Sequence, residues 1–94
     1  MTIVIALKAQ EDLRLAYAYV YRDNPKAADQ LLMRITEMIG SLAAGLIKGK
    51  EVRLNNGRVV NTWPIPPYRI YYRIQGQEFQ VIRVYQQARP PIER

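Results

Sequence analysis

The fold is decided by the stretch Pro67-Tyr68-Arg69-Ile70-Tyr71-Tyr72-Arg73-Ile74, the polar turn Gln75-Gly76-Gln77-Glu78, and the run from Phe79 to Tyr85. Both runs are rich in β-branched and aromatic residues, which is typical of a β-hairpin. Because side chains alternate along a strand, the first run predicts one face that packs on helices and one that points outward. The packed face would carry Tyr68, Ile70, Tyr72 and Ile74, and the outward face Arg69, Tyr71 and Arg73.

The N-terminal half predicts one strand and a first helix. Thr2 to Leu7 is a β-branched and apolar run, expected to form a strand buried on both faces. A helix would follow from about residues 8–10, with Glu11 and Asp12 in its first turn, near the positive end of the helix dipole. Its apolar stripe, at helical spacing, is Leu13, Ala16, Tyr17 and Val20.

The second helix has the clearest boundaries. Asn24 is a good N-cap and Pro25 suits the first helical position, so the helix is expected to begin there. It would run to about Ala43, with Gly45 as a stop signal. The loop between the two helices is only a few residues long, which predicts an antiparallel helical hairpin. The apolar stripe of the second helix is Ala28, Leu31, Leu32, Ile35, Met38, Ile39 and Leu42.

The segment between this helix and the hairpin is polar, basic and then rich in proline. Residues 46–56 predict either a mobile connection or a short edge strand, and Asn56-Gly57 a turn. A strand is expected from Arg58 to Trp63. Proline cannot pair regularly inside a sheet, so Pro64, Pro66 and Pro67 predict a bulge or a crossover. Trp63 would be either a plug in the core, the favoured interpretation, or an anchor for a partner.

These elements predict one α+β domain over residues 1–94, of order β-α-α-β-β-β. The helical hairpin would cover one face of a small, mostly antiparallel sheet. A proline pair at residues 90–91 would end the sheet and leave a frayed tail from about residue 90.

Composition excludes several classes of function. The chain has no histidine and no cysteine, so it lacks the commonest general base, the commonest metal ligand and any thiolate. No metal and no cofactor are therefore expected. No apolar run is long enough to span a bilayer and no signal peptide is recognised, so a cytoplasmic protein with no membrane partner is expected.

The net charge of +6 lies entirely in the C-terminal half. The first 43 residues carry five basic and five acidic side chains, whereas the remaining 51 carry nine basic and three acidic ones. This positive charge favours an acidic partner, either nucleic acid or protein. The alternative is that it only keeps a small protein soluble.

Several short matches together resemble the RelE/ParE superfamily of type II toxins. They run in order along nearly the whole chain: Asp12-Leu13, Asn24-Pro25 with Ala27-Ala28, Gly57-Arg58, residues 67–74, residues 82–85 and Ala88-Arg89. The resemblance implies the fold given above, a cognate antitoxin as partner, and one of two targets. Members of the ParE branch poison DNA gyrase without cutting it, and members of the RelE branch cut messenger RNA on the ribosome without a metal. Roles in plasmid stabilization and growth inhibition would follow from either.

The residues favour the ParE branch. Arg69 matches the arginine that RelE-like nucleases place before the hairpin turn. Their lysine pair falls near Val60 and Thr62, which supply no cation, and their last basic or imidazole group falls at Gln86 or Gln87. Many ParE-like relatives also carry histidine there, so the glutamine pair departs from the pattern of both branches. Metal-free cleavage of RNA needs a proton acceptor, and arginine, with a pKa above about 12, cannot serve as one near neutral pH. A nuclease with a degenerate site, using Arg69, Arg73 and Tyr85, and a non-toxic antitoxin-binding relative remain as alternatives.

The outward face of the hairpin is the expected target-binding surface, because arginine and tyrosine are enriched at binding hot spots. The alternative is that this face of the sheet is simply exposed to solvent and binds no target. An antitoxin would bind as an amphipathic helix or an extended strand across the helical hairpin and the sheet edge. The candidate target-binding residues are Arg58, Arg69, Tyr71, Arg73, Arg83, Gln87 and Arg89.

Overall fold

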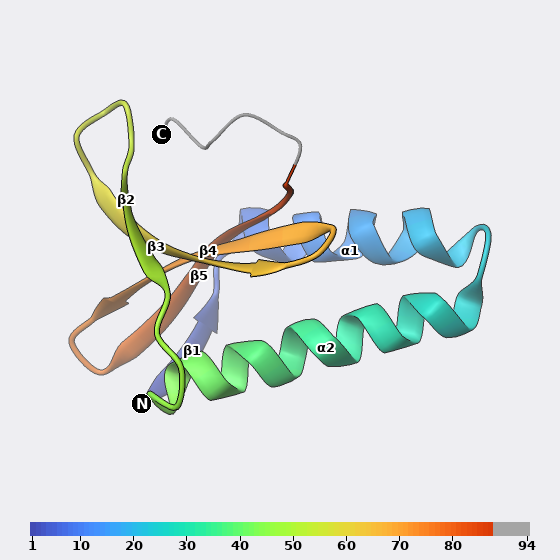
Figure 1. The fold of residues 1–94 in the computed structure, drawn as a ribbon, viewed down its shortest axis with the longest axis horizontal. Helices are drawn as coiled ribbons and strands as arrows, with labels where there is room; N and C mark the ends of the chain where they lie inside the picture. Colours follow the sequence, from blue (N-terminus) through green and yellow to red (C-terminus); the bar gives the residue numbers. More distant parts are fainter. Residues whose placement is uncertain (88–94) are drawn as a thin grey trace.

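The computed structural model describes residues 1–87, and Figure 1 shows their arrangement. The predicted α+β class is confirmed: two helices pack on a five-stranded sheet of order β1-β5-β4-β3-β2. β1 pairs with β5 in parallel, and every other neighbouring pair of strands is antiparallel. The elements are β1 Thr2–Ile5, α1 Leu7–Tyr21, α2 Pro25–Ala43, β2 Lys50–Arg53, β3 Val59–Ile65, β4 Tyr68–Gln75 and β5 Glu78–Gln86.

Local sequence signals set the helix ends. The Asn24 side chain accepts a hydrogen bond from the Ala27 backbone N–H at 3.1 Å and Pro25 opens α2, as predicted. Gly45 follows the C-terminus with φ of 78°, a conformation that glycine adopts without steric penalty. α1 and α2 lie side by side and antiparallel, joined by a short loop at the right of Figure 1.

The first helix begins earlier than expected. α1 starts at Leu7, so no acidic residue lies in its first turn, and the prediction for Glu11 and Asp12 was wrong. Asp12 lies in the second turn, where its carboxylate serves a tertiary contact instead of the helix dipole.

β1 is an edge strand, so the expectation that it would be buried on both faces was also wrong. Among the described strands it pairs only with β5. Thr2 and Ile3 are exposed, and Val4 and Ile5 are only half-buried. An apolar β-branched run by itself cannot distinguish an edge strand from a central one.

The prolines do not interrupt pairing. β3 and β4 form a tight hairpin that stays in register to Ile65↔Tyr68 around a cis Pro66–Pro67 bond, so the predicted bulge or crossover was wrong. On its other side, β3 pairs with β2 only as far as Thr62. Pro64 lies beyond that point, where the missing N–H has no ladder partner to lose. Of the alternatives for residues 46–56, the short edge strand is the one observed, as β2.

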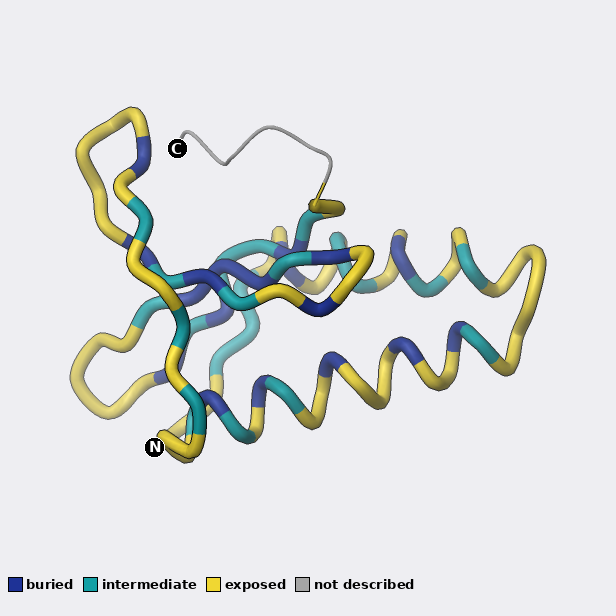
Figure 2. The backbone as a smooth tube through the Cα atoms, viewed as in Figure 1, coloured by how far each residue is buried: buried dark blue, intermediate teal, exposed yellow. Residues whose placement is uncertain are grey.

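Two hydrophobic clusters occupy the two faces of the sheet. The inner face packs on the helices and includes Ile70 and Phe79, both fully buried. The outer face carries a smaller cluster of Leu54, Val60 and Tyr71, against which Ile82 and Tyr85 pack. Figure 2 shows that the buried positions of α2 recur along the side that faces the sheet.

Burial along β4 follows the predicted alternation with two corrections. Tyr68, Ile70 and Tyr72 are buried on the inner face as expected, but Ile74 is 52% exposed because it lies next to the hairpin turn. Tyr71 lies on the outer face but is only 6% exposed, since the outer cluster covers it. The pairing of β4 and β5 shifts here, with Tyr71 opposite Arg83 and Tyr72 opposite Val81.

Candidate functional site

Arg69 and two tyrosines form the centre of the outer face. Arg69 lies directly opposite Tyr85 in the β4–β5 ladder, and its guanidinium donates to the Thr62 hydroxyl oxygen at 3.3 Å. The Tyr71 and Tyr85 rings form a T-shaped pair, with 6.2 Å between centroids. We call Arg69, Tyr71 and Tyr85 the arginine–tyrosine cluster. Their three positions are fixed by two paired strands, which makes the surface rigid.

Arg83 is held by helix α1. Its Nε donates to one Asp12 carboxylate oxygen at 2.8 Å and a terminal nitrogen donates to the other at 3.0 Å. The hydrogen bonding to Asp12 is the main reason that the pKa of Arg83 lies above its usual value. The guanidinium carbon also lies 4.3 Å from the centroid of the Tyr85 ring. Arg83 thus fixes both the helix and Tyr85, and a direct contact with the target stays a prediction.

The remaining candidates are spread along the sheet. Arg73 lies four residues from Arg69, about 13 Å along an extended strand, and donates to the Gln80 side chain at 2.7 Å. Arg58 is exposed beside the β2–β3 turn. Gln87 is exposed, and its backbone N–H donates to the Pro67 carbonyl at 2.8 Å. Arg89 lies outside the described residues, as do the predicted end of the sheet at residues 90–91 and the predicted frayed tail.

The three nuclease candidates do not converge. Arg69 and Tyr85 are cross-strand neighbours, but Arg73 lies toward the opposite end of β4. Val60 and Thr62, which occupy the positions of the lysine pair in RelE-like enzymes, are buried at 2% and 3% exposure. Between residues 1 and 87, no group of three His, Cys, Asp or Glu side chains is placed to hold a metal ion.

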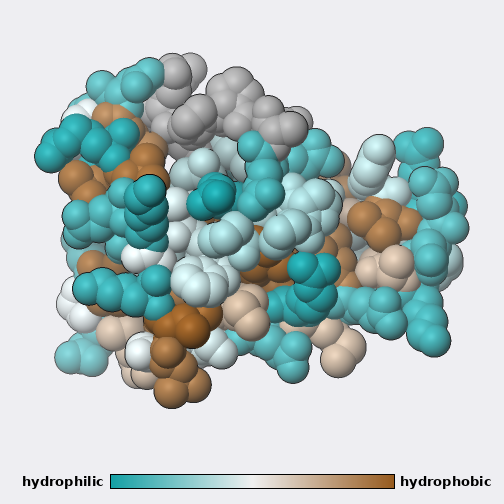
Figure 3. Space-filling view, in the orientation of Figure 1, coloured by the Kyte–Doolittle hydropathy of each residue, from teal (hydrophilic) through white to brown (hydrophobic). Residues whose placement is uncertain are grey.

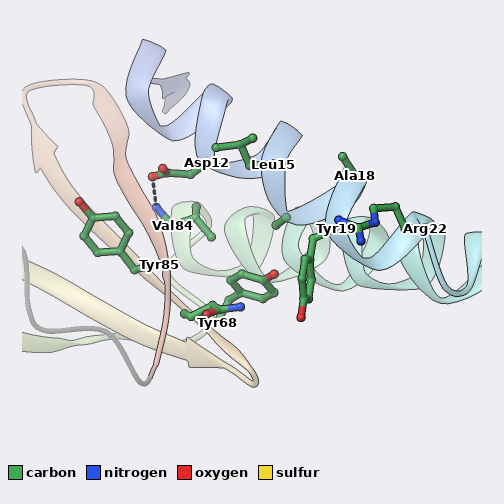
Figure 4. A pocket seen from close by; sticks show the side chains of 10 residues that line it. Asp12, Leu15, Ala18, Tyr19, Arg22, Tyr68, Val84 and Tyr85 are labelled. Carbon is green, nitrogen blue, oxygen red and sulfur yellow. Dashed lines mark hydrogen bonds between the residues drawn. The ribbon is translucent and has the colours of Figure 1, made fainter.

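A groove that the sequence did not reveal lies between α1 and the adjoining ends of β4 and β5. It encloses about 520 Å³. Leu15 and Tyr19 line its helical wall and are 53% and 62% exposed. In Figure 4, Tyr68 and Tyr19 project into it, whereas the Tyr85 side chain points away from them. Leu15 and Tyr19 fall outside the apolar stripe of α1, and this second stripe is the signal that could have predicted the groove.

The open edge of β5 forms part of this groove. β1 pairs with β5 only as far as Val81, and beyond that point no other described strand pairs with β5 on that side. Asp12 covers part of the edge by accepting the Val84 backbone N–H at 2.9 Å, drawn as a dashed line in Figure 4. Gln86, one of the two glutamines that depart from the family pattern, lies on the groove wall.

Two apolar features lie away from the groove and the arginine–tyrosine cluster. Trp63 is half-buried and packs on the inner cluster, as expected for a plug in the core. Hydrophobic surface gathers at the lower left of Figure 3, where the chain passes from α2 to β2, and Leu46 in that connection is 78% exposed. No helix within the described part of the chain is long and apolar enough to cross a membrane.

Comparisons with known proteins identify the family. Residues 3–91 match the family described as the ParE toxin of the type II toxin–antitoxin system parDE. A solved structure, titled as the chromosomal ParDE TA system from P. aeruginosa, is similar with a TM-score of 0.75 at 23% identity, over 92% of this chain and 95% of that one. No curated protein gave a significant match. The chain therefore belongs to the ParE toxin family of type II toxin–antitoxin systems.

Proposed function

We propose that this chain is a cytoplasmic toxin that binds DNA gyrase and is neutralised by a cognate antitoxin. The observation that carries the proposal is the arginine–tyrosine cluster: Arg69 faces Tyr85 across the ladder, and Tyr85 is braced by both Tyr71 and Arg83. Arginine and tyrosine held rigidly by a sheet suit a binding surface, because little side-chain entropy is lost when a partner docks.

The same cluster is poorly suited to acid–base catalysis. Arg69 donates to Thr62, and a guanidinium group is a hydrogen-bond donor without an acceptor atom. The chain contains no histidine that could act as the proton acceptor. Binding without bond cleavage is the function that these side chains support best.

The test is a binding measurement between the purified chain and each purified gyrase subunit. We expect saturable binding that Arg69→Ala weakens at least tenfold, together with inhibition of supercoiling. Lys8→Ala is the matched control, because it removes an exposed cation from α1, away from the outer face. Absence of binding by the unmodified chain, or equal binding by Arg69→Ala, would contradict the proposed target site.

We place the antitoxin in the groove between α1 and β5. Leu15 and Tyr19 offer apolar surface there, and the uncovered edge of β5 offers backbone groups to an extended segment. Arg22 on the groove wall suits an acidic antitoxin side chain. Leu15→Asp should weaken antitoxin binding more than tenfold and leave gyrase binding intact. Met33→Asp is the control, since Met33 is a 63% exposed apolar residue of α2 that does not line the groove.

A further inference from the structure

The outer face also carries cations that form no ion pair with any residue from 1 to 87. Within residues 1–87 the ion pairs are Arg14–Glu11 and Arg83–Asp12. Arg69 and Arg73 instead donate to the uncharged side chains of Thr62 and Gln80. The Lys50 side chain is exposed on β2 and makes no hydrogen bond or ion pair with the described residues.

These three cations lie on one face. Lys50 is opposite Thr62, and Thr62 is opposite Tyr71, so the three residues form one row across β2, β3 and β4. Arg69 and Arg73 flank Tyr71 on the same side of β4. Strand spacing puts Lys50 about 10 Å from the β4 backbone, and Arg69 and Arg73 are about 13 Å apart. We call Lys50, Arg69 and Arg73 the outer cations.

Of the described acidic residues in the C-terminal half, Glu51 points away from the outer cations, whereas Glu78 shares their face at the hairpin turn. Glu51 alternates with Lys50 and therefore points to the opposite face of β2. Glu78 accepts the Gln80 amide at 2.7 Å, and Gln80 in turn accepts from Arg73, so Glu78 is linked to Arg73 through Gln80 and forms no ion pair with it. The surface thus presents three positive charges at intervals of about 10–13 Å, a spacing that suits a polyanion with regularly placed charges.

We infer that the outer cations bind the phosphate backbone of double-stranded DNA. Binding to a single strand depends on aromatic rings on which bases stack. Here Tyr71 is only 6% exposed, and the Tyr85 ring is flanked by the Arg83 guanidinium at 4.3 Å and by the Tyr71 ring. The face therefore offers phosphate contacts without a stacking platform, which favours a duplex and predicts no sequence preference.

The choice of DNA over duplex RNA rests on the proposed function, because gyrase holds DNA when a toxin meets it. The toxin would then contact the enzyme and its DNA together. Lys50 and Arg73 would add affinity for the gyrase–DNA complex over gyrase alone, through contacts that the protein target does not supply.

The test uses the purified chain and a fluorescent 20-base-pair DNA duplex, without gyrase, with anisotropy read from about 50 to 200 mM salt. Three phosphate contacts predict a log–log slope of about −2.7, a loss of roughly 40-fold in affinity over that range. The double variant with Lys50→Gln and Arg73→Gln should have a shallower slope of about −0.9. Its affinity should then fall only about threefold to fourfold over the same salt range. Lys8→Gln with Lys26→Gln removes the same charge from the helices and should leave the slope unchanged.

The other outcomes each contradict the inference in a distinct way. No binding at 50 mM salt would exclude a DNA site, and an equal effect of the two double variants would show attraction by net charge alone. Tighter binding of duplex RNA or single-stranded RNA of the same length would overturn the assignment to DNA. Gyrase binding is measured in a separate experiment. A failure of DNA binding would therefore leave the proposed gyrase target standing, and a failure of gyrase binding would leave the DNA-binding result standing.

Discussion

The Asp12 carboxylate on α1 receives two hydrogen bonds from Arg83 on β5, although the two residues are 71 positions apart in the chain. A third bond comes from the Val84 backbone N–H, so one side chain joins the first helix to the open edge of the last strand. Both side chains are largely buried, at 11% and 19% exposure, so solvent screens this pair less than a surface ion pair.

Asp12→Ala should therefore destabilise the fold by about 2–3 kcal/mol, because it leaves a largely buried guanidinium and a strand N–H without their acceptor. Chemical denaturation measures the change. Glu11→Ala is the control, since its partner Arg14 is on the exposed side of the same helix, and that variant should unfold like the unmodified chain. Equal midpoints for all three proteins would show that Asp12 does not hold α1 on the sheet.

Gly49 should not tolerate a side chain. Its N–H donates to the Tyr72 hydroxyl at 2.8 Å, and a Cβ there would lie 2.6 Å from both that oxygen and the Thr62 carbonyl. Gly49→Ala should cost about 1–3 kcal/mol, as for overpacking. Gly40→Ala is the matched change: a Cβ at Gly40, inside α2, meets nothing within 4 Å, so it should stabilise by up to about 1 kcal/mol. Thermal melts of the two variants should move in opposite directions.

The two faces of β4 should separate stability from activity. Tyr72 is 3% exposed and stacks on Phe79 with 4.6 Å between ring centroids, so Tyr72→Ala should cost roughly 3–5 kcal/mol. Arg69→Ala loses one 3.3 Å hydrogen bond and should cost about 1 kcal/mol or less, while abolishing toxicity. Denaturation midpoints and growth after induction measure the two effects. Similar losses of stability for both variants would contradict the assignment of the faces.

Tyr17 ties the two helices together in a pH-dependent way. Its hydroxyl donates to the Asp29 carboxylate at 2.6 Å, and this bond is the main reason that the pKa of Tyr17 is raised. A raised folded-state pKa gives stability that is complete below the ordinary tyrosine pKa of about 10 and is lost as the pH rises through the folded-state value. Melts of Tyr17→Phe should therefore lie below those of the unmodified chain at pH 7, and the difference should shrink as the pH rises above about 10. Tyr21→Phe, which removes a hydroxyl without a hydrogen bond among the described residues, should track the unmodified chain throughout.

Local signals predicted the parts of this fold that depend on neighbouring residues. The ends of α2 are set by Asn24, Pro25 and Gly45. Their capping ability and their φ preferences follow from residue type, so they can be recognised in the sequence alone. The inner face of β4 followed from alternation, since Tyr68, Ile70 and Tyr72 contact the helices as expected.

Contacts between distant segments were not predictable in this way. Tyr71 is buried because Leu54 and Val60 cover it, and that requires knowing that β2 and β3 extend the outer face beside β4. The Asp12–Arg83 pair and the groove beside it depend equally on tertiary packing. The prediction for Pro64 was wrong because a strand can accommodate a proline where no neighbouring strand needs its N–H. That depends on where β2 ends, which the residues around Pro64 do not encode.

The central claim is that the chain disables gyrase without cutting RNA. The most direct measurement is to induce the toxin without its antitoxin in a bacterial host, and within minutes to map messenger RNA ends by primer extension and to assay trapped gyrase–DNA complexes in the same culture. We expect trapped complexes, DNA damage and filamentation with messages intact, and Arg69→Ala should show none of these. Codon-phased cuts at the ribosomal A site with undamaged chromosomes would contradict this account and assign Arg69, Arg73 and Tyr85 to a nuclease.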